Sequence, residues 1–150
     1  MADTFKIKIH SISEKDFFLK HKLLPKTKEA CETELNPGFG FKISVDSENS
    51  LLIVDANAFY STNDTIVVAS LEFEYSLLFE NISNFVKVGD NGSEIKIPKN
   101  LMEVIVQEIY VTGRTLLNRR LKNTVLENLY LPFNGASDLW KKLKNSDVAK

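Results

Sequence analysis

The sequence predicts an α+β domain: a four-stranded antiparallel sheet with a long helix and a short C-terminal helix packed on one face. Three observations carry this prediction. Apolar and polar residues alternate over separate stretches of the first half of the chain. A segment with helical apolar spacing runs from about Pro98 to Leu121. Strands followed by helices, rather than alternating with them, are typical of α+β architecture.

The first two strands are predicted on either side of a polar connection. Residues 5–9 alternate apolar and polar side chains, which is typical of a half-buried strand. Residues 13–36 are polar and lysine-bearing, and are expected to form a long loop or to hold a short helix. Pro37-Gly38 is expected to end this connection. A second alternating strand is then predicted over residues 39–45.

A third strand is predicted over residues 51–60, and a hairpin connection at 61–64 leads to the fourth and longest strand, residues 67–80. Its apolar side chains all fall on one face: Val67, Ala69, Leu71, Phe73, Tyr75, Leu77 and Phe79. Such alternation favours an antiparallel sheet with one covered face. The long helix is the element expected to cover it.

Pro98 can begin the long helix because a first-turn residue needs no N–H partner. Two neighbouring apolar rows mark this helix: Leu101, Ile105, Ile109 and Leu116 form one, and Met102, Val106, Tyr110, Leu117 and Leu121 form the other. At ~100° per residue the rows span roughly 180°, wider than the ~100° stripe that faces a single core. We therefore expect this helix to pack on its own sheet and on a second subunit or a client. The residues assigned to an oligomer interface are Met102, Val106, Tyr110, Gly113 and Leu117.

The C-terminal segment is predicted to end with a second, shorter helix. Asn123 is expected to stop the long helix, and residues 129–133 to cross as an extended segment. Ser137 is a suitable N-cap for a helix over 138–144. Its packing residues would be Leu139, Trp140 and Leu143.

Composition favours a single domain over residues 1–150 and excludes several protein classes. Nineteen basic and twenty acidic side chains give a net charge of −1, which argues against nucleic-acid binding. We find no apolar run long enough to span a membrane and no signal peptide, so a cytoplasmic location is expected. Cys31 is the only cysteine, so an intrachain disulfide is excluded.

No residue pattern nominates a catalytic or metal site. His10 and His21 lack neighbouring ligands, and acids beside Cys31 would raise its thiol pKa rather than lower it. Glu72 and Glu74 fit a solvated sheet face, and residues 89–93 fit a plain turn. We therefore expect a binding protein without a cofactor rather than an enzyme. Three late arginines of the long helix would complement its dipole or contact an acidic client segment: Arg114, Arg119 and Arg120.

Four segments resemble the SecB-type export chaperones and their toxin–antitoxin-associated relatives. Thr4-Phe-Lys-Ile-Lys-Ile resembles the opening strand of that family, and Pro37-Gly-Phe-Gly-Phe-Lys-Ile-Ser-Val-Asp its second strand. The hairpin over 51–80 resembles its third and fourth strands. The segments Ile97-Pro, Val111-Thr-Gly-Arg-Thr and Asn128-Leu-Tyr-Leu-Pro-Phe resemble its long helix and the stretch before the final helix.

This resemblance implies a dimer of dimers assembled through the long helix, with a groove that holds unfolded polypeptide without ATP. Carried over by position, Phe41 and Ile43 would line the client-binding surface. Leu139, Trp140 and Leu143 of the last helix would cover it. For each of the five, ordinary core packing is the alternative.

The charge of this chain departs from the family pattern. Export chaperones of this type are strongly acidic, whereas this chain is near neutral and ends in a lysine-rich segment, residues 141–150. The departure weighs against docking on the export motor ATPase, and leaves a general or toxin–antitoxin-associated chaperone role open. The alternative function is a carrier of a small apolar ligand or lipid, held between sheet and helix.

Overall fold

The computed structural model describes residues 7–84, 86–88 and 95–144. Its main strands are β1 (Ile7–Leu19), β2 (Leu35–Asp46), β3 (Leu51–Thr62) and β4 (Val67–Phe79). Two short strands, β5 (Lys87–Val88) and β6 (Ile95–Lys96), pair with each other. The helices are α1 (Lys28–Glu34), α2 (Lys99–Arg120) and α3 (Gly135–Lys144), with 3-10 turns at His21–Leu23 and Ile82–Asn84.

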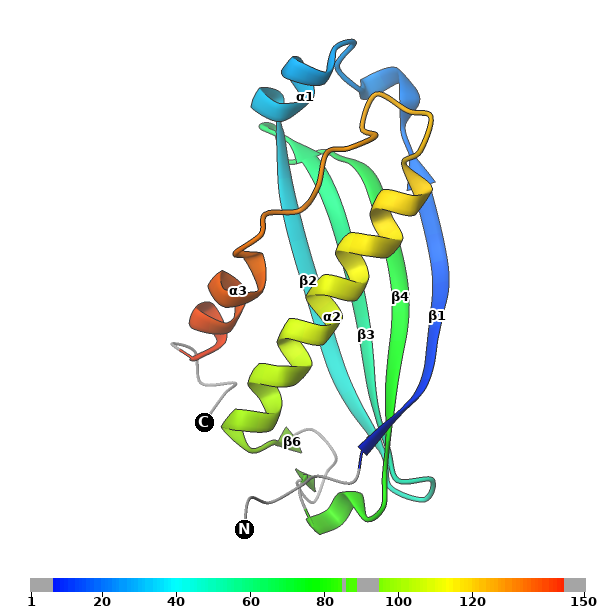
Figure 1. Cartoon of the computed structure of the whole chain (residues 1–150), viewed down its shortest axis with the longest axis vertical. Helices are drawn as coiled ribbons and strands as arrows, with labels where there is room; N and C mark the ends of the chain where they lie inside the picture. The colour runs from blue at the N-terminus through cyan, green and yellow to red at the C-terminus, as the bar shows by residue number, and fades with distance from the viewer. Residues whose placement is uncertain (1–6, 85, 89–94, 145–150) are drawn as a thin grey trace.

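The four long strands form one antiparallel sheet in the order β1-β4-β3-β2 (Figure 1). β1 and β2 are therefore the two edges. The register of the strands places apolar residues opposite one another on the face that forms the core. Val54 of β3 lies opposite Tyr75 of β4, and Phe41 of β2 lies opposite Ala56 of β3. The predicted α+β architecture, with helices on one face of a four-stranded sheet, is confirmed.

α2 crosses the covered face of the sheet diagonally, from the β2 side near its start towards β1 at its end (Figure 1). Gly113 of α2 lies directly against aromatic side chains of the sheet. A Cβ there would lie 2.7 Å from a ring carbon of Phe39 and 3.0 Å from one of Phe73. Glycine at this position therefore lets two aromatic rings of the sheet pack directly against the helix.

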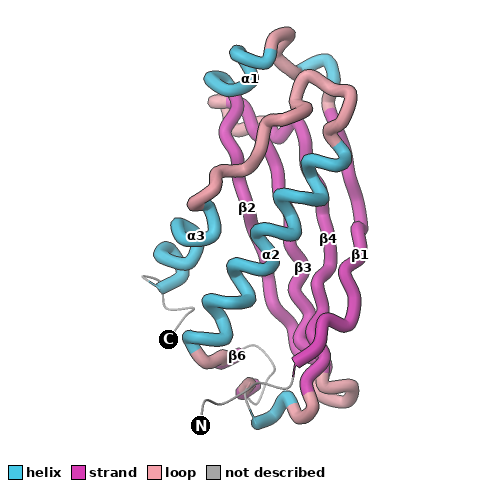
Figure 2. The backbone as a smooth tube through the Cα atoms, in the orientation of Figure 1, coloured by secondary structure: helices cyan, strands magenta, loops and turns pink. Residues whose placement is uncertain are grey.

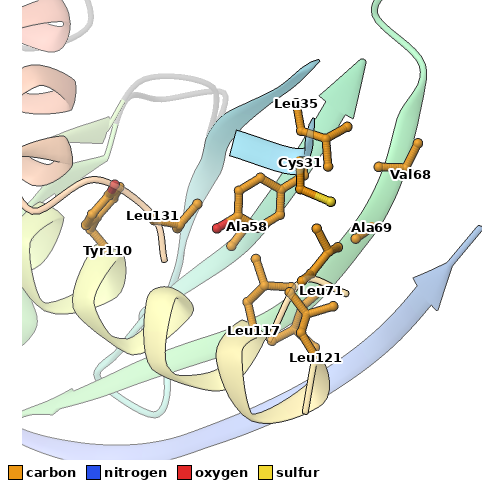
Figure 3. Close-up of a cluster of buried hydrophobic side chains, with 12 residues drawn as sticks. Cys31, Leu35, Ala58, Val68, Ala69, Leu71, Tyr110, Leu117, Leu121 and Leu131 are labelled. Atoms are coloured by element: carbon orange, nitrogen blue, oxygen red, sulfur yellow. The ribbon is translucent and has the colours of Figure 1, made fainter. Parts of the chain in front are cut away.

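The strap, defined as residues 121–134, returns from the end of α2 to α3 and is drawn as loop in Figure 2. It buries Leu126 and Leu131, at 0% and 3% exposure. Figure 3 shows Leu131 near Tyr110, and Leu121 beside Leu117, within a cluster of buried side chains. The Tyr60 hydroxyl donates a hydrogen bond of 3.1 Å to the Leu129 carbonyl. The strap is thus part of the core.

The N-terminal half departs from prediction in two places. β1 continues to Leu19, well into the segment expected to be a connection, because its pairing with β4 extends through two register irregularities. The rest of that segment holds a short helix, α1, one of the two predicted alternatives. Pro37-Gly38 lies inside β2 rather than before it, since Pro37 pairs with Tyr60 on an edge strand. Phe5 lies outside the described residues.

The helix boundaries also differ in detail. α2 spans Lys99–Arg120 with Pro98 at its N-cap, close to the prediction, and Asn123 has a left-handed φ of 67° just beyond the end. α3 begins at Gly135, three residues before the predicted start at Asp138. Ser137 is therefore inside the first turn, and its assignment as N-cap is wrong. No described helix is both long enough and apolar enough to cross a membrane.

Both apolar rows of α2 pack within the chain. The residues assigned to an oligomer interface are all buried: Met102 at 8%, Val106 at 0%, Tyr110 at 4%, Leu117 at 1%, and Gly113. The width of the apolar arc is explained by the sheet on one side and by α3 and the strap on the other. The assignment of these residues to an oligomer interface stays a prediction. For them to contact a second copy, the packing within one chain would have to open and expose them.

Candidate functional site

α3 packs beside α2 and leaves a groove on each of its sides. The β2 groove, of roughly 170 Å³, lies between α3 and the start of β2. Its lining residues are Pro37, Gly38, Phe39, Tyr110, Leu131, Pro132, Gly135, Asp138, Leu139 and Lys142. The α2–α3 groove, of roughly 290 Å³, lies on the other side. It is lined by Glu103, Gln107, Tyr110, Val111, Arg114, Phe133, Asn134, Ala136, Ser137 and Trp140.

An aromatic row leads from the core to the β2 groove. The ring centroid of Phe39 lies 6.4 Å from that of Phe73 and 5.2 Å from that of Tyr110, both in tilted geometry. Such offset aromatic pairs add to the stabilisation that burial alone provides. Because Phe73 is fully buried, the groove wall formed by Phe39 and Tyr110 is anchored in the sheet.

Tyr110 lines both grooves. Its hydroxyl donates a hydrogen bond of 3.0 Å to the Pro132 carbonyl, at the junction between the strap and α3. The Arg114 guanidinium lies 5.9 Å from the centre of its ring. Burial raises the pKa of the Tyr110 phenol, an effect that Arg114 opposes. The phenol is therefore a neutral donor at physiological pH.

The α2–α3 groove exposes more apolar surface than its neighbour. Phe133 is 89% exposed and Val111 is 42% exposed. Trp140 of α3, half-buried, completes this patch. An aromatic ring left this open is unusual in an isolated domain, and contiguous exposed apolar residues mark interaction surfaces.

A third groove lies on the opposite flank of α2. The β1 groove, of roughly 270 Å³, is lined by Ile7, Ile9, Tyr75, Leu77, Leu101, Val104, Ile105 and Glu108. Ile9 and Val104 are 56% and 55% exposed. The Tyr75 hydroxyl donates a hydrogen bond of 3.3 Å to the Glu108 carboxylate. The diagonal course of α2 leaves this part of the sheet uncovered.

The five residues assigned to client binding are distributed over β2 and three positions of α3. Phe41 and Ile43 are half-buried on the covered face of β2, packed against the core beneath α2. Leu139 lines the β2 groove, and Trp140 lines the α2–α3 groove. Leu143 is half-buried one turn further along α3. The assigned role of these residues stays a prediction.

Sequence reasoning did not single out Phe133, Phe39 or Val111 as site residues. The signal for Phe133 was present, because Leu131-Pro132-Phe133 is an apolar run just before a helix with its own apolar face. Phe39 was counted only as a strand residue. Its place in a groove depends on the position of α3, which the local pattern does not fix.

The other candidate residues lie apart from these grooves. His10 and His21 are exposed, and the described residues hold no group of three potential metal ligands. Cys31 is fully buried, and this burial, with smaller effects of Glu34 and Glu32, raises its pKa. Glu74 lies 4.0 Å from Lys15 on the uncovered face of the sheet.

Two of the three late arginines of α2 make contacts within the chain. Arg120 forms a paired contact with Glu14 of β1, at 3.0 and 3.4 Å, and lies over the ring of Phe17. Arg114 lies over Tyr110. Arg120 therefore fastens the end of α2 to an edge strand, a structural role beyond the predicted dipole interaction.

Comparisons with solved structures include a likeness to a known chaperone. A SecB-like chaperone of Mycobacterium tuberculosis, solved in complex with a peptide from an antitoxin, is similar with a TM-score of 0.46 and 14% sequence identity. The match covers 84% of this chain and 86% of that chain. No family model matches the sequence, and no curated protein matches it. Membership of the SecB-like family stays a prediction.

Proposed function

We propose that this protein is an ATP-independent holdase that binds unfolded or non-native polypeptide in the grooves beside α3. The observation that carries the proposal is the exposed apolar patch of Phe133, Val111 and Trp140. Non-native chains expose apolar side chains that native proteins bury, so a surface of this kind would discriminate between the two states. The sequence resemblance to SecB-type chaperones supports the same function.

The free edge of β2 offers a second means of recognition. Pro37 lacks an N–H group, and proline within a sheet is confined to the unpaired side of an edge strand. Alternate residues direct their backbone groups to the same side. We infer that Phe39, Phe41 and Ile43 also present their N–H and C=O groups outward. An extended client could pair with these groups while its side chains enter the β2 groove.

Self-association is part of the proposal. The β1 groove, with Ile9 and Val104 more than half exposed, is an uncovered apolar surface beside the other free edge. A second copy placed there would leave the grooves beside α3 open to clients. Light scattering is expected to give a mass above the 17.0 kDa of one chain. A strict monomer would contradict this part of the proposal.

Several finer points belong to the same proposal. The protein would act in the cytoplasm, without catalysis or cofactor, either generally or in a toxin–antitoxin system. The near-neutral charge offers no support for docking on an export motor. The carrier alternative is less favoured, because Leu52, Phe73 and Ile109 are fully buried and fill the centre of the space between the sheet and α2. The β1 groove beside them is an open groove at the flank of α2.

An aggregation assay tests the proposed holdase activity. The protein should suppress light scattering by a client diluted from denaturant, without ATP. Phe133→Ser should lose most of this suppression, because it removes the most exposed ring of the patch. Ile66→Ser is the matched control, since Ile66 is also exposed, at 43%, but lies in the β3–β4 turn. Equal suppression by the two variants would overturn the assignment of this patch.

A further inference from the structure

Tyr110 of α2 and Gly135 at the beginning of α3 lie close together. A Cβ built at Gly135 would overlap the hydroxyl oxygen and ring of Tyr110, so only glycine fits beneath the ring as α3 is placed. The Pro132 carbonyl accepts two hydrogen bonds at 3.0 Å, one from the Tyr110 hydroxyl and one from the Gly135 amide. The first turn of α3 is thereby bound to one side chain of α2.

This contact lies between the two grooves beside α3. Tyr110 lines both of them, Gly135 lines the β2 groove and Phe133 lines the α2–α3 groove. A rotation of α3 about this contact would widen one groove and narrow the other. The position of α3 relative to Tyr110 therefore determines how wide each of the two grooves is.

A second tyrosine, Tyr60, is bonded to the strap but does not line either groove. The Tyr60 hydroxyl donates to the Leu129 carbonyl, three residues before Pro132, from within the core. Tyr60 is 2% exposed and lines neither groove. The two tyrosines thus make the same kind of bond to neighbouring carbonyls, and only one of them lies against α3.

We propose that Tyr110 is a positioning residue, a pivot that holds α3 between the two grooves and so controls how readily they admit a polypeptide. This inference rests on the proposed function and names its regulation. The hydroxyl bond to Pro132 stabilises the observed position of α3. Client binding in the α2–α3 groove shifts α3 away from that position, and the hydroxyl bond to Pro132 is lost.

Trp140 reports on α3 without any client. It is the only tryptophan of the chain and lies on α3 in the α2–α3 groove. Tyr110→Phe removes the hydroxyl and keeps the ring against Phe39. We expect increased quenching of Trp140 fluorescence by a soluble quencher. We also expect amide hydrogen exchange in α3 to become about three- to ten-fold faster, the factor given by loss of one hydrogen bond.

Tyr60→Phe is the matched control. It should accelerate exchange in the strap near Leu129 and leave Trp140 quenching unchanged. Gly135→Ala provides a second perturbation, because its methyl group must push α3 away from Tyr110. It should change Trp140 emission even if the overall stability falls. Unchanged Trp140 quenching in both Tyr110→Phe and Gly135→Ala would overturn the pivot.

Client binding separates this inference from the proposed function. A labelled, permanently unfolded polypeptide should bind Tyr110→Phe about three- to ten-fold more tightly than the wild type, since the pre-existing bond no longer opposes movement of α3. Equal affinities alongside increased quenching would overturn the control of client binding by Tyr110. If Trp140 responds but neither protein binds the polypeptide, the proposed function fails while the positioning of α3 by Tyr110 stands.

Discussion

Both flanks of α2 expose apolar side chains, Ile9 and Val104 on one and Val111 and Phe133 on the other, but the two flanks are bounded in different ways. On the β1 flank, a groove lies between the helix and a strand of the same sheet, and both walls belong to the core. On the α3 flank, the grooves are bounded by a helix that follows the strap, packs beside α2, and has the Tyr110 hydroxyl bond to the Pro132 carbonyl next to its first turn.

This difference separates two kinds of apolar surface. The walls of the β1 groove cannot move without disturbing the sheet, so a rigid partner such as a second copy suits it. On the α3 flank, one wall packs on the core through the partly buried Ala136 and Leu139. We therefore expect it to shift more easily than a strand of the sheet, which suits clients of variable shape. The same helix thus supplies a fixed surface on one side and an adjustable one on the other.

The largest effect on stability is expected from a substitution in the core beneath both flanks of α2. Phe73→Ala should lower the free energy of unfolding by about 3–5 kcal/mol, because it empties a fully buried site shared by Phe39 and Gly113. Phe133→Ala, at an 89% exposed site, should change it by less than about 0.5 kcal/mol. Urea denaturation measures both. Comparable losses would mean that the exposed ring contributes to the core.

The second prediction distinguishes the flanks by client affinity. Replacing Phe133 and Trp140 together by alanine should weaken binding of an unfolded polypeptide by about 30-fold or more, as expected for aromatic hot spots. Replacing Ile9 and Val104 together by serine should leave the affinity within a factor of about three. Fluorescence anisotropy of a labelled polypeptide measures both. An opposite ranking would assign client binding to the β1 groove.

The third prediction concerns self-association on the fixed flank. Ile9→Lys should shift the assembly towards the monomer, because a desolvated ammonium group would replace an apolar contact in the β1 groove. Ile66→Lys adds the same charge at a similarly exposed isoleucine elsewhere. Sedimentation velocity compares the two. The β1 groove is not the interface if both variants assemble like the wild type.

The smallest effect is a dependence of stability on alkaline pH. Burial and then the charge of Glu108 raise the pKa of Tyr75 from 10.0 to about 12. The folded state therefore holds this proton more tightly, and the contribution is complete below pH about 10 and lost as the pH rises through about 12. The urea midpoint should fall over that interval. Tyr75→Phe should show a shallower fall, and an equally steep one would contradict this origin.

Local periodicity was sufficient to predict the sheet and the long helix. The alternation in β4 and the spacing in α2 identify the side chains that are buried, and both elements form close to the predicted bounds. The extent of β1 was missed because its charged residues, such as Lys15 and Glu14, are stabilised by partners on β3 and α2. Those partners are far away in sequence, so no local pattern indicates them.

The grooves were harder to predict because they depend on how elements are arranged. The wide apolar arc of α2 was interpreted as a surface for a partner, yet Val106 and Leu117 are covered within the chain. Trp140 was correctly placed on the last helix, but its groove exists only because the strap brings Phe133 beside α2. Sequence periodicity identifies an apolar face and does not say which neighbour covers it.

Binding of unfolded polypeptide is tested most directly by a calorimetric titration of a permanently unfolded polypeptide into this protein, with the native form of the same polypeptide as control. We expect binding of the unfolded form alone, weakened when Phe133 and Trp140 are replaced by alanine. Absence of binding to the unfolded form, or equal binding of both forms, would contradict the proposed holdase function.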